Sequence, residues 1–391
     1  MIAGSILTLN AGSSSLKFGL FEAGTLRRMV SGGFEEVHGT PRLTAKDENG
    51  ELVADRSIRQ KKPPVEALLG ELFDCLETRL ADRPLAAVGH RIVHGGGRFV
   101  APVSLSEAVV RELDALTPMA PLHQPACLEP VHALMRSHPG LPQVGCFDTA
   151  FHHTLAPPAS RYALPRAFEE QGIRRYGFHG LSYEFIAGRL RETSPENFGK
   201  RAVVAHLGSG CSLCAMRKGK SLDTTMGFTA LDGLMMATRP GAMDPGIILY
   251  LQQVRGMSAK EVEGVLYHRS GLLGVSGSSG DVRDLLTSEH SQAAEALDLF
   301  TFRIAREVAA IANTLQGLEV LVFTGGIGEH AWQIREAVCE RLRWLGVKLD
   351  KDANRSGKER IADRQSVVEI HVIATDEELT IARQVSTVIG G

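Results

Sequence analysis

The sequence lacks a net charge of either sign. Its 43 Lys and Arg residues nearly balance 45 Asp and Glu residues, which leaves a formal net charge of -2. No long run of Lys or Arg provides a local basic field instead. Because nucleic acids are attracted by positive potential, we expect no nucleic acid partner.

Long apolar segments are also missing. Residues 1–10 have neither the charged start nor the apolar core of a signal peptide, and the most apolar stretches, such as residues 246–251, are too short to span a bilayer. We therefore expect a cytoplasmic protein with no membrane partner.

Cysteine is sparse, with 6 residues scattered over a chain of 391. This favours reduced thiols over a disulfide framework. Cys211 and Cys214 are spaced as in metal and redox motifs. If they lie in a strand, however, residues three apart point to opposite faces, and no second pair completes a zinc set. Metal or redox use of this pair is the minor alternative.

Two similar hairpins are predicted. β-prone runs at residues 5–9 and 16–21 flank a turn rich in glycine and serine, and the same pattern returns at 203–207 and 212–216 around residues 208–210. We infer two structurally similar halves, with a chance resemblance of loops as the alternative.

A chain of this length usually forms two domains. Helical periodicity mixed with short strands predicts α/β halves with a cleft between them. The helices are expected at residues 65–79, 258–267, 291–316, 331–342 and 377–388.

A proline-rich segment at residues 156–158 indicates a change of domain. We assign residues 1–150, completed by the C-terminal helix 375–391, to an N-terminal domain. Residues 151–374 form the C-terminal domain in this assignment.

Three glycine-rich turns follow predicted strands, at residues 12–15, 208–210 and 324–329. Such turns let backbone N–H groups approach phosphate oxygens closely. A Walker A loop ending at Lys220 and Ser221 is rejected, because Cys214 stands where its first glycine belongs. The turn at 324–329 also matches a variant dinucleotide fingerprint, but too little chain follows it for a dinucleotide-binding half.

Charged and imidazole side chains stand beside sharp turns. Arg91 and Arg239 lie next to Gly-Gly and Pro-Gly sequences, where an arginine binds anions more often than on a helix surface. His123 and His179 are similarly placed, although each has the alternative of a core histidine. The carboxylates of Asp148 and Glu377 follow apolar runs and suit Mg²⁺, or else cap helices.

Taken together, nine segments resemble the acetate kinase family, within the superfamily of sugar kinases, Hsp70 chaperones and actin. The resemblance extends from the first strand to the last helix. The matching segments are residues 10–18, 89–96, 120–123, 147–152, 174–180, 223–229, 270–277, 281–284 and 323–329.

The resemblance implies two duplicated ribonuclease H-like domains of the actin-like ATPase type, flanking a nucleotide cleft. It implies reversible transfer of the ATP γ-phosphoryl group to acetate by direct in-line attack. Mg²⁺ is the expected metal, with Mn²⁺ as a substitute, and the expected assembly is a homodimer.

Site residues carry over from the family by position. The catalytic set is Asn10, Arg91, Asp148, His179 and Arg239, and the metal is assigned to Asn10 and Glu377, together with Asp148; Glu378 is a weaker substitute for Glu377. The acyl substrate is assigned to Arg91, Val93, Leu122, His123, Phe178 and Ala230. The nucleotide is assigned to Lys17, His206, Leu207, Gly208, Ser209, Gly210, Asp281, Val282, Arg283, Gly325, Gly326, Ile327, Gly328 and Glu329, and Ser13 and Ser15 also match the first phosphate-side loop.

The chain departs from the family pattern at several positions. Ser209 stands where asparagine is common, and Ala230 replaces a proline in the wall of the acyl pocket. Losing the proline ring leaves space for one more methylene, so propionate is a second expected substrate. Gly97, Tyr183 and Ala242 also differ, and none of the three is assigned to chemistry.

Three alternatives remain open. A butyrate kinase differs only in the length of the acid that it accepts. A non-catalytic ATP-binding clamp would not need the acyl-phosphate residues, and a NAD-dependent oxidoreductase would need to bind a nicotinamide cofactor.

Overall fold

The computed structural model describes residues 3–12 and 15–390. The chain divides into two compact units. Unit 1 comprises residues 1–150 and 376–391, and unit 2 comprises residues 151–375. The division after Ala150 lies upstream of the proline-rich segment. In the described ranges, no helix is both long and apolar enough to cross a membrane.

Unit 1 is built on a mixed sheet with the strand order β5-β4-β3-β2-β1-β6-β8-β7. Its strands are β1 (Ser5–Ala11), β2 (Ser15–Glu22), β3 (Arg28–Glu35), β4 (Arg42–Asp47), β5 (Leu52–Ser57), β6 (Leu85–Ile92), β7 (Val103–Ser104) and β8 (Gln143–Phe147). Its helices are α1 (Val65–Asp82), α2 (Glu107–Asp114), α3 (Gln124–Ser137) and α15 (Glu377–Gly390).

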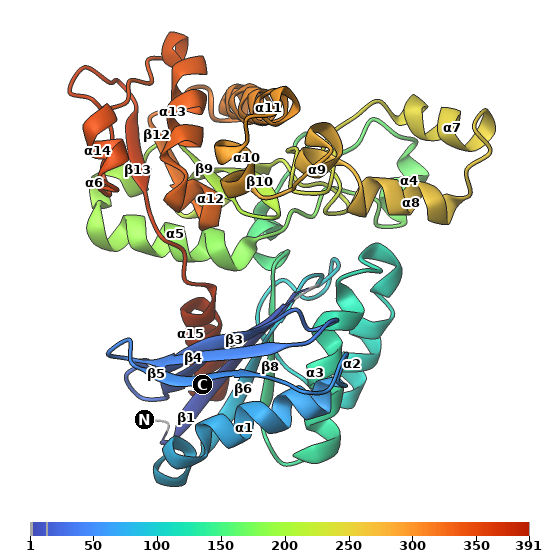
Figure 1. Ribbon diagram of the computed structural model, residues 1–391, viewed down its shortest axis with the longest axis vertical. Coiled ribbons are helices and arrows are strands. Elements are labelled where there is room, and N and C mark those ends of the chain that lie inside the picture. Colours follow the sequence, from blue (N-terminus) through green and yellow to red (C-terminus); the bar gives the residue numbers. More distant parts are fainter. Residues whose placement is uncertain (1–2, 13–14, 391) are drawn as a thin grey trace. The chain divides into compact units, whose positions relative to one another are not determined.

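The core of unit 1 forms where strand residues meet two helices. Alternate residues of β1 to β4 pack against apolar residues of α1 and α3, including Leu72, Leu76 and Leu134, which are fully buried. The last helix, α15, packs on β1, β6 and β8 (Figure 1). Gly89 of β6 permits this contact, because a Cβ atom there would lie 2.5 Å from methyl carbons of Ile381 and Val385.

Unit 2 is built on a five-stranded sheet with the order β11-β10-β9-β12-β13. Its strands are β9 (Ala202–Leu207), β10 (Cys211–Arg217), β11 (Lys220–Thr224), β12 (Val320–Thr324) and β13 (Glu369–Val372). Its helices are α4 (Arg166–Glu170), α5 (Gly180–Thr193), α6 (Pro195–Phe198), α7 (Pro245–Gln253), α8 (Ala259–His268), α9 (Gly271–Ser276), α10 (Val282–Thr287), α11 (Ser291–Leu315), α12 (Gly325–His330), α13 (Trp332–Arg341) and α14 (Lys351–Arg355).

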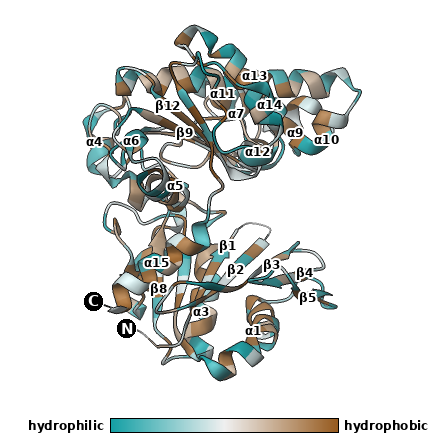
Figure 2. Ribbon diagram, turned by 90° about the vertical axis from the view of Figure 1, so that its left-hand side faces the viewer, coloured by the Kyte–Doolittle hydropathy of each residue, from teal (hydrophilic) through white to brown (hydrophobic). Residues whose placement is uncertain are grey.

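The central strands of unit 2 are buried over their whole length. Every residue of β9 and β12 is buried, and both strands are mostly brown in the hydropathy colouring of Figure 2. Helices α5 and α11 lie on opposite faces of this sheet and both contact β9 (Figure 1). A continuous apolar run is what a strand covered on both faces requires.

The two sheets share one topology. In each, a first strand pairs antiparallel with the second and parallel with a strand that follows a helical crossover: β1 with β2 and β6, and β9 with β10 and β12. A further parallel strand, β8 or β13, extends each sheet. This confirms the expected fold class of two ribonuclease H-like α/β domains.

Candidate active site

A cluster of charged side chains gathers in unit 1 at the ends of three strands. Arg91, the penultimate residue of β6, donates from Nε and Nη2 to Oδ2 of Asp148 at 3.1 and 2.6 Å. Asp148 directly follows β8 and its side chain is only 1% exposed. The parallel pairing of β6 with β8 brings these two strand ends together. The pattern of apolar runs ending in polar residues is therefore what assembles the pair.

Asn10 connects this pair to the C-terminal helix. Its Oδ1 accepts from Nη1 of Arg91 at 3.2 Å, and its Nδ2 donates to Oε2 of Glu377 at 2.9 Å. We expected Asn10 to open the loop after the first strand, but β1 continues to Ala11. Pairing with Lys17 of β2 holds Asn10 inside the sheet, so its side chain is fixed by strand geometry.

Two acidic residues at the start of α15, Asp376 just before the helix and Glu377 as its first residue, make different contacts. Asp376 caps the helix, because its Oδ1 accepts from the backbone N–H of Leu379 at 2.9 Å. Glu377 instead contacts Asn10. Capping therefore explains Asp376, whereas Glu377 belongs to the polar cluster.

Burial and charge oppose one another in this cluster. Burial raises the pKa of Glu377, the nearby Arg91 guanidinium opposes that rise, and the negative charge of Asp148 adds to it. Burial acts to lower the pKa of Arg91, but the carboxylates of Asp148 and Glu377 overcome it and raise that pKa. Arg91 therefore stays charged and balances only part of the negative charge around it.

The cluster has features that suit a divalent cation. Oδ1 of Asp148 is buried and has no hydrogen-bond partner among the described residues. Two carboxylates and an amide oxygen are hard oxygen ligands of the kind that Mg²⁺ takes, usually as one or two carboxylates completed by waters and phosphates. No group of three or more His, Cys, Asp or Glu side chains is arranged for a metal in residues 3–12 and 15–390.

In unit 2, His179 stands at the N-terminus of α5 in a left-handed backbone conformation, with φ of 60°. A histidine in that conformation carries strain, which usually persists only where the surroundings hold it. Its Nδ1 lies 2.8 Å from Oγ of Ser212, and its ring stacks on His206 with centroids 4.3 Å apart.

Arg239 lies beside the glycine-rich loop of the same unit. A Cβ atom on Gly210 would approach Nη2 of Arg239 at 3.1 Å and Nε2 of His179 at 3.2 Å, so both groups face this glycine. Nη1 of Arg239 donates to the carbonyl of Ala230 at 2.8 Å. The structure therefore brings His179, Arg239 and Gly210 together.

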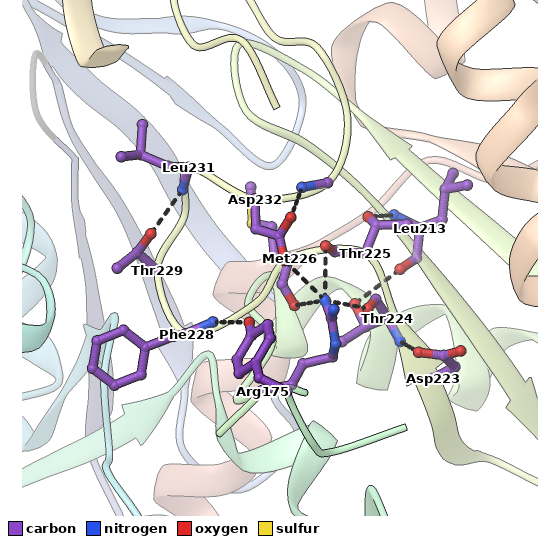
Figure 3. Close-up of polar contacts among 12 residues, drawn as sticks. Arg175, Leu213, Asp223, Thr224, Thr225, Met226, Phe228, Thr229, Leu231 and Asp232 are labelled. Carbon is purple, nitrogen blue, oxygen red and sulfur yellow. Dashed lines mark hydrogen bonds and ion pairs between the residues drawn. The ribbon is translucent and has the colours of Figure 1, made fainter. Parts of the chain in front are cut away.

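The segment that carries Ala230 is held by a second arginine (Figure 3). Nη1 of Arg175 lies within 3.3 Å of the carbonyl oxygens of Thr224, Thr225 and Met226 and of a carboxylate oxygen of Asp232. A guanidinium surrounded by acceptors in this way fixes the backbone on both sides of Ala230. Sequence reasoning passed over Arg175, although it lies within the matching segment 174–180.

A cavity of about 750 Å³ opens next to the glycine-rich loop of unit 2. Seven of the residues expected to bind nucleotide line it: Gly208, Ser209, Asp281, Val282, Arg283, Gly326 and Ile327. Its lining also includes residues that were not expected, namely Ala237, Gly280, Leu286, Thr287, His330, Ala331, Trp332 and Gln333. Trp332 is one of only two tryptophans in the chain, and that rarity was the available signal.

The other expected nucleotide residues do not line this cavity. Leu207 and Gly328 are buried, and Gly325 packs so closely that a Cβ atom would lie 2.7 Å from the carbonyl of Leu207. Oε1 of Glu329 accepts from the backbone N–H groups of Gly325 and Thr375. These residues shape the loop.

Four further expected positions lie away from the cavity lining or outside the described residues. His206 contacts Ser182 through Nδ1 at 2.9 Å. Lys17 is exposed on β2 in unit 1, and Ser15 begins that strand. Ser13 lies outside the described residues.

Of the six expected acyl-substrate residues, four lie in unit 1 and two, Phe178 and Ala230, lie in unit 2. Val93 of unit 1 and Phe178 of unit 2 are each 3% exposed, whereas Leu122, His123 and Ala230 are half-buried. His123 directly precedes α3. The apolar character expected of a pocket for a methyl group is present at each of these positions except His123.

Two ribonuclease H-like units, one with a charged cluster suited to Mg²⁺ and one with a glycine-lined cavity, define a phosphotransferase of the class that uses ATP. Comparison with known proteins gives the family. A model described as the acetokinase family matches residues 5–383, and the chain belongs to this family.

Similar proteins agree over the full length. The chain is 50% identical over 387 residues to an acetate kinase of Rhodopseudomonas palustris, with 97% of each chain covered. The crystal structure of a propionate kinase from Francisella tularensis is similar with a TM-score of 0.90 and 36% identity, covering 97% of this chain and 98% of that one. An acetate kinase structure from Porphyromonas gingivalis is similar with a TM-score of 0.86 and 35% identity, covering 99% and 100%.

Proposed function

We propose that this protein transfers the γ-phosphoryl group of Mg²⁺-bound ATP to acetate, reversibly, giving acetyl phosphate and ADP. Propionate is its second substrate. The observation that carries the proposal is the Arg91, Asp148, Asn10 and Glu377 cluster, because a chain that only binds ATP has no use for it.

The reaction balances without a proton transfer. A carboxylate oxygen of acetate forms a bond to the γ-phosphorus, the bond from that phosphorus to the bridging oxygen breaks, and ADP leaves with its electron pair. Negative charge spreads over the equatorial oxygens of the transferred group. The protein therefore contributes position and positive charge.

The roles follow from the charges. The Arg91 guanidinium is held rigidly by Asp148 and Asn10, so it presents its charge with little loss of rotamer freedom. In unit 2, Arg239 and Nε2 of His179 face Gly210 and supply further donors. Asp148, Asn10 and Glu377 would hold Mg²⁺, which when bound supplies charge neutralisation for the phosphate oxygens.

The nucleotide is assigned to the cavity of unit 2. Gly208, Ser209 and Gly326 present backbone without large side chains, which suits phosphate, while Trp332, Leu286 and Ala331 provide apolar surface for a base. The Ser209 hydroxyl can donate to phosphate in place of the amide that is common in the family.

Acceptance of propionate rests on Ala230. A methyl side chain in place of a proline ring leaves space for one more methylene, whose burial contributes about 0.8 kcal/mol. The similarity to a propionate kinase structure supports this extension.

The assembly is proposed to be a homodimer. None of the residues of α7 is buried, although the helix carries large apolar side chains. Ile247, Leu249 and Tyr250 are 46%, 53% and 51% exposed. An apolar helix exposed in this way is typical of a surface that another subunit covers. Sedimentation of the wild-type protein and of the Leu249→Glu variant measures the oligomeric state. A wild-type monomer would contradict the proposed homodimer.

Acyl-phosphate formation tests the proposal. ATP, Mg²⁺ and the protein are incubated with acetate, propionate or butyrate, and the product is trapped as its hydroxamate. We expect product with acetate and propionate and much less with butyrate. Folded protein that binds ATP but gives no product with any acid would contradict the proposal and favour the non-catalytic clamp.

A further inference from the structure

A buried phenol lies behind His179. Tyr183 is on α5, one helical turn after His179, and is 0% exposed. Its hydroxyl lies 2.6 Å from Oγ of Ser212. The same Oγ lies 2.8 Å from Nδ1 of His179. Ser212 therefore connects the tyrosine to the histidine ring.

The position of Ser212 makes this connection rigid. Ser212 is in β10, paired with His206 of β9, and is itself fully buried. The helix contributes Tyr183 and the strand contributes Ser212, so two separate elements fix the ring of His179. This is the restraint that a residue with φ of 60° requires.

The chain of hydroxyls also orders the protons. Burial raises the pKa of Tyr183 well above its usual value, so the phenol keeps its proton. When that proton is donated to Ser212, the single hydroxyl hydrogen of Ser212 is available for Nδ1 of His179. A neutral imidazole that accepts at Nδ1 carries its own proton on Nε2.

The other ring nitrogen faces the glycine-rich loop. Nε2 of His179 and Nη2 of Arg239 would lie 3.2 and 3.1 Å from a Cβ atom on Gly210. An N–H group at Nε2 therefore points a donor toward the same place as the Arg239 guanidinium. The opposite tautomer would present a lone pair there, which repels a phosphoryl oxygen.

We propose that Tyr183 is a positioning residue for phosphoryl transfer: through Ser212 it holds His179 as the tautomer protonated on Nε2, with that N–H directed at the Gly210 loop. The inference rests on the proposed function for its role in turnover. The geometry of the hydroxyl chain stands independently of it.

The test substitutes Tyr183→Phe, which removes one oxygen and keeps the ring. Nitrogen-15 NMR of histidine-labelled protein gives the tautomer of His179, assigned through the loss of its signals in His179→Asn. We expect the signals to move from the Nε2-protonated form toward a mixture of tautomers. We also expect kcat to fall about tenfold, as loss of one buried hydrogen bond implies, with KM for ATP and acetate unchanged.

Matched variants keep the test decisive. Tyr176→Phe removes a phenol that contacts the carbonyl of Gly172 at 2.9 Å and should change neither the tautomer nor kcat. Ser212→Ala removes the hydroxyl that connects Tyr183 to His179 and should reproduce the effect of Tyr183→Phe. Either variant that folds is therefore sufficient for the test. The double variant should be no worse than the more damaging single one, because both remove one connection.

An unchanged tautomer in the folded variants would overturn the proposal, even if kcat fell, because the effect would then be merely structural. An unchanged kcat beside a shifted tautomer would equally overturn it. A shifted tautomer in a protein whose wild type transfers no phosphoryl group would refute the proposed function and leave the positioning geometry intact.

Discussion

Five strands of unit 1, in the order β3-β2-β1-β6-β8, correspond to the five strands of unit 2, but the polar groups at the ends of the first strands differ between the units. The penultimate residue of the first strand is Asn10 in unit 1 and His206 in unit 2, each just before a loop rich in glycine and serine. In unit 1 that residue belongs to a network of ions, whereas in unit 2 it stacks on a second imidazole beside a cavity. The comparison shows that a duplicated scaffold fixes the positions of functional groups, whereas the residue types at those positions can differ between the two copies.

Substitution of one arginine in each unit gives the largest expected effects. We expect Arg91→Ala and Arg239→Ala each to lower kcat/KM by about 10² to 10³, because the proposed function gives each arginine a charge contact in the transition state. Arg91→Ala should also destabilise its unit, since it leaves the buried Asp148 carboxylate without its cation.

Kinetics and urea unfolding measure both effects. All Trp and Tyr residues lie in unit 2, so fluorescence reports only that unit and circular dichroism is needed for unit 1. Arg98→Ala, at an exposed ion pair, is the control for unit 1, and Arg343→Ala is the control for unit 2. Wild-type turnover in the folded Arg91 or Arg239 variants would sink the assignment.

Acid should lower the free energy of unfolding of unit 1. Burial lowers the pKa of His90 to about 4 from 6.5. The unfolded chain therefore binds more protons between these values, and the free energy of unfolding falls as the pH drops from 6.5 toward 4. The loss is on the order of 2 kcal/mol at pH 5.

The measurement is urea unfolding of unit 1 by circular dichroism at pH 7, 6 and 5. His90→Gln should flatten the pH dependence, because an amide does not titrate. His94, whose pKa burial also lowers to about 4, should leave part of the slope in that variant. An equal slope in wild type and in a double variant of both histidines would contradict this account.

Ala230→Pro gives the smallest expected effect. Restoring the ring should raise the preference for acetate over propionate about fourfold, the equivalent of one methylene. Rates with the two acids under identical conditions measure this ratio, and KM for ATP is the internal control. An unchanged ratio would mean that this wall does not set the chain length.

Local patterns predicted part of the scaffold. Periodicity and turn residues predict both hairpins with glycine-rich turns, the α/β class and the long helix at 291–316. The structure places that helix, α11, at Ser291–Leu315. Strands β3 to β5 were not predicted: β3 and β5 show no clean alternation of buried and exposed residues, and the short alternation of β4 was passed over.

The site was predictable only in part. Family positions named Asn10 and Glu377 separately, but no local pattern indicates contact between residues 367 apart in the chain. Tyr183 was noticed only as a departure from the family, since its contact with Ser212 depends on how α5 lies on β10. The residues that line the cavity from α13 were missed for the same reason.

The return of α15 to the first unit has a consequence for synthesis. Unit 2 is inserted between Ala150 and Asp376, so most of unit 1 leaves the ribosome long before the helix that completes its sheet. Because chains are made at about 5 to 20 residues per second, the β1–β6 face waits more than 10 seconds for its cover. Glu377 follows the whole of unit 2 in the sequence, so the carboxylate that contacts Asn10 is synthesised only after unit 2. A nascent chain therefore has no complete cluster of Arg91, Asp148, Asn10 and Glu377 until unit 2 has been synthesised.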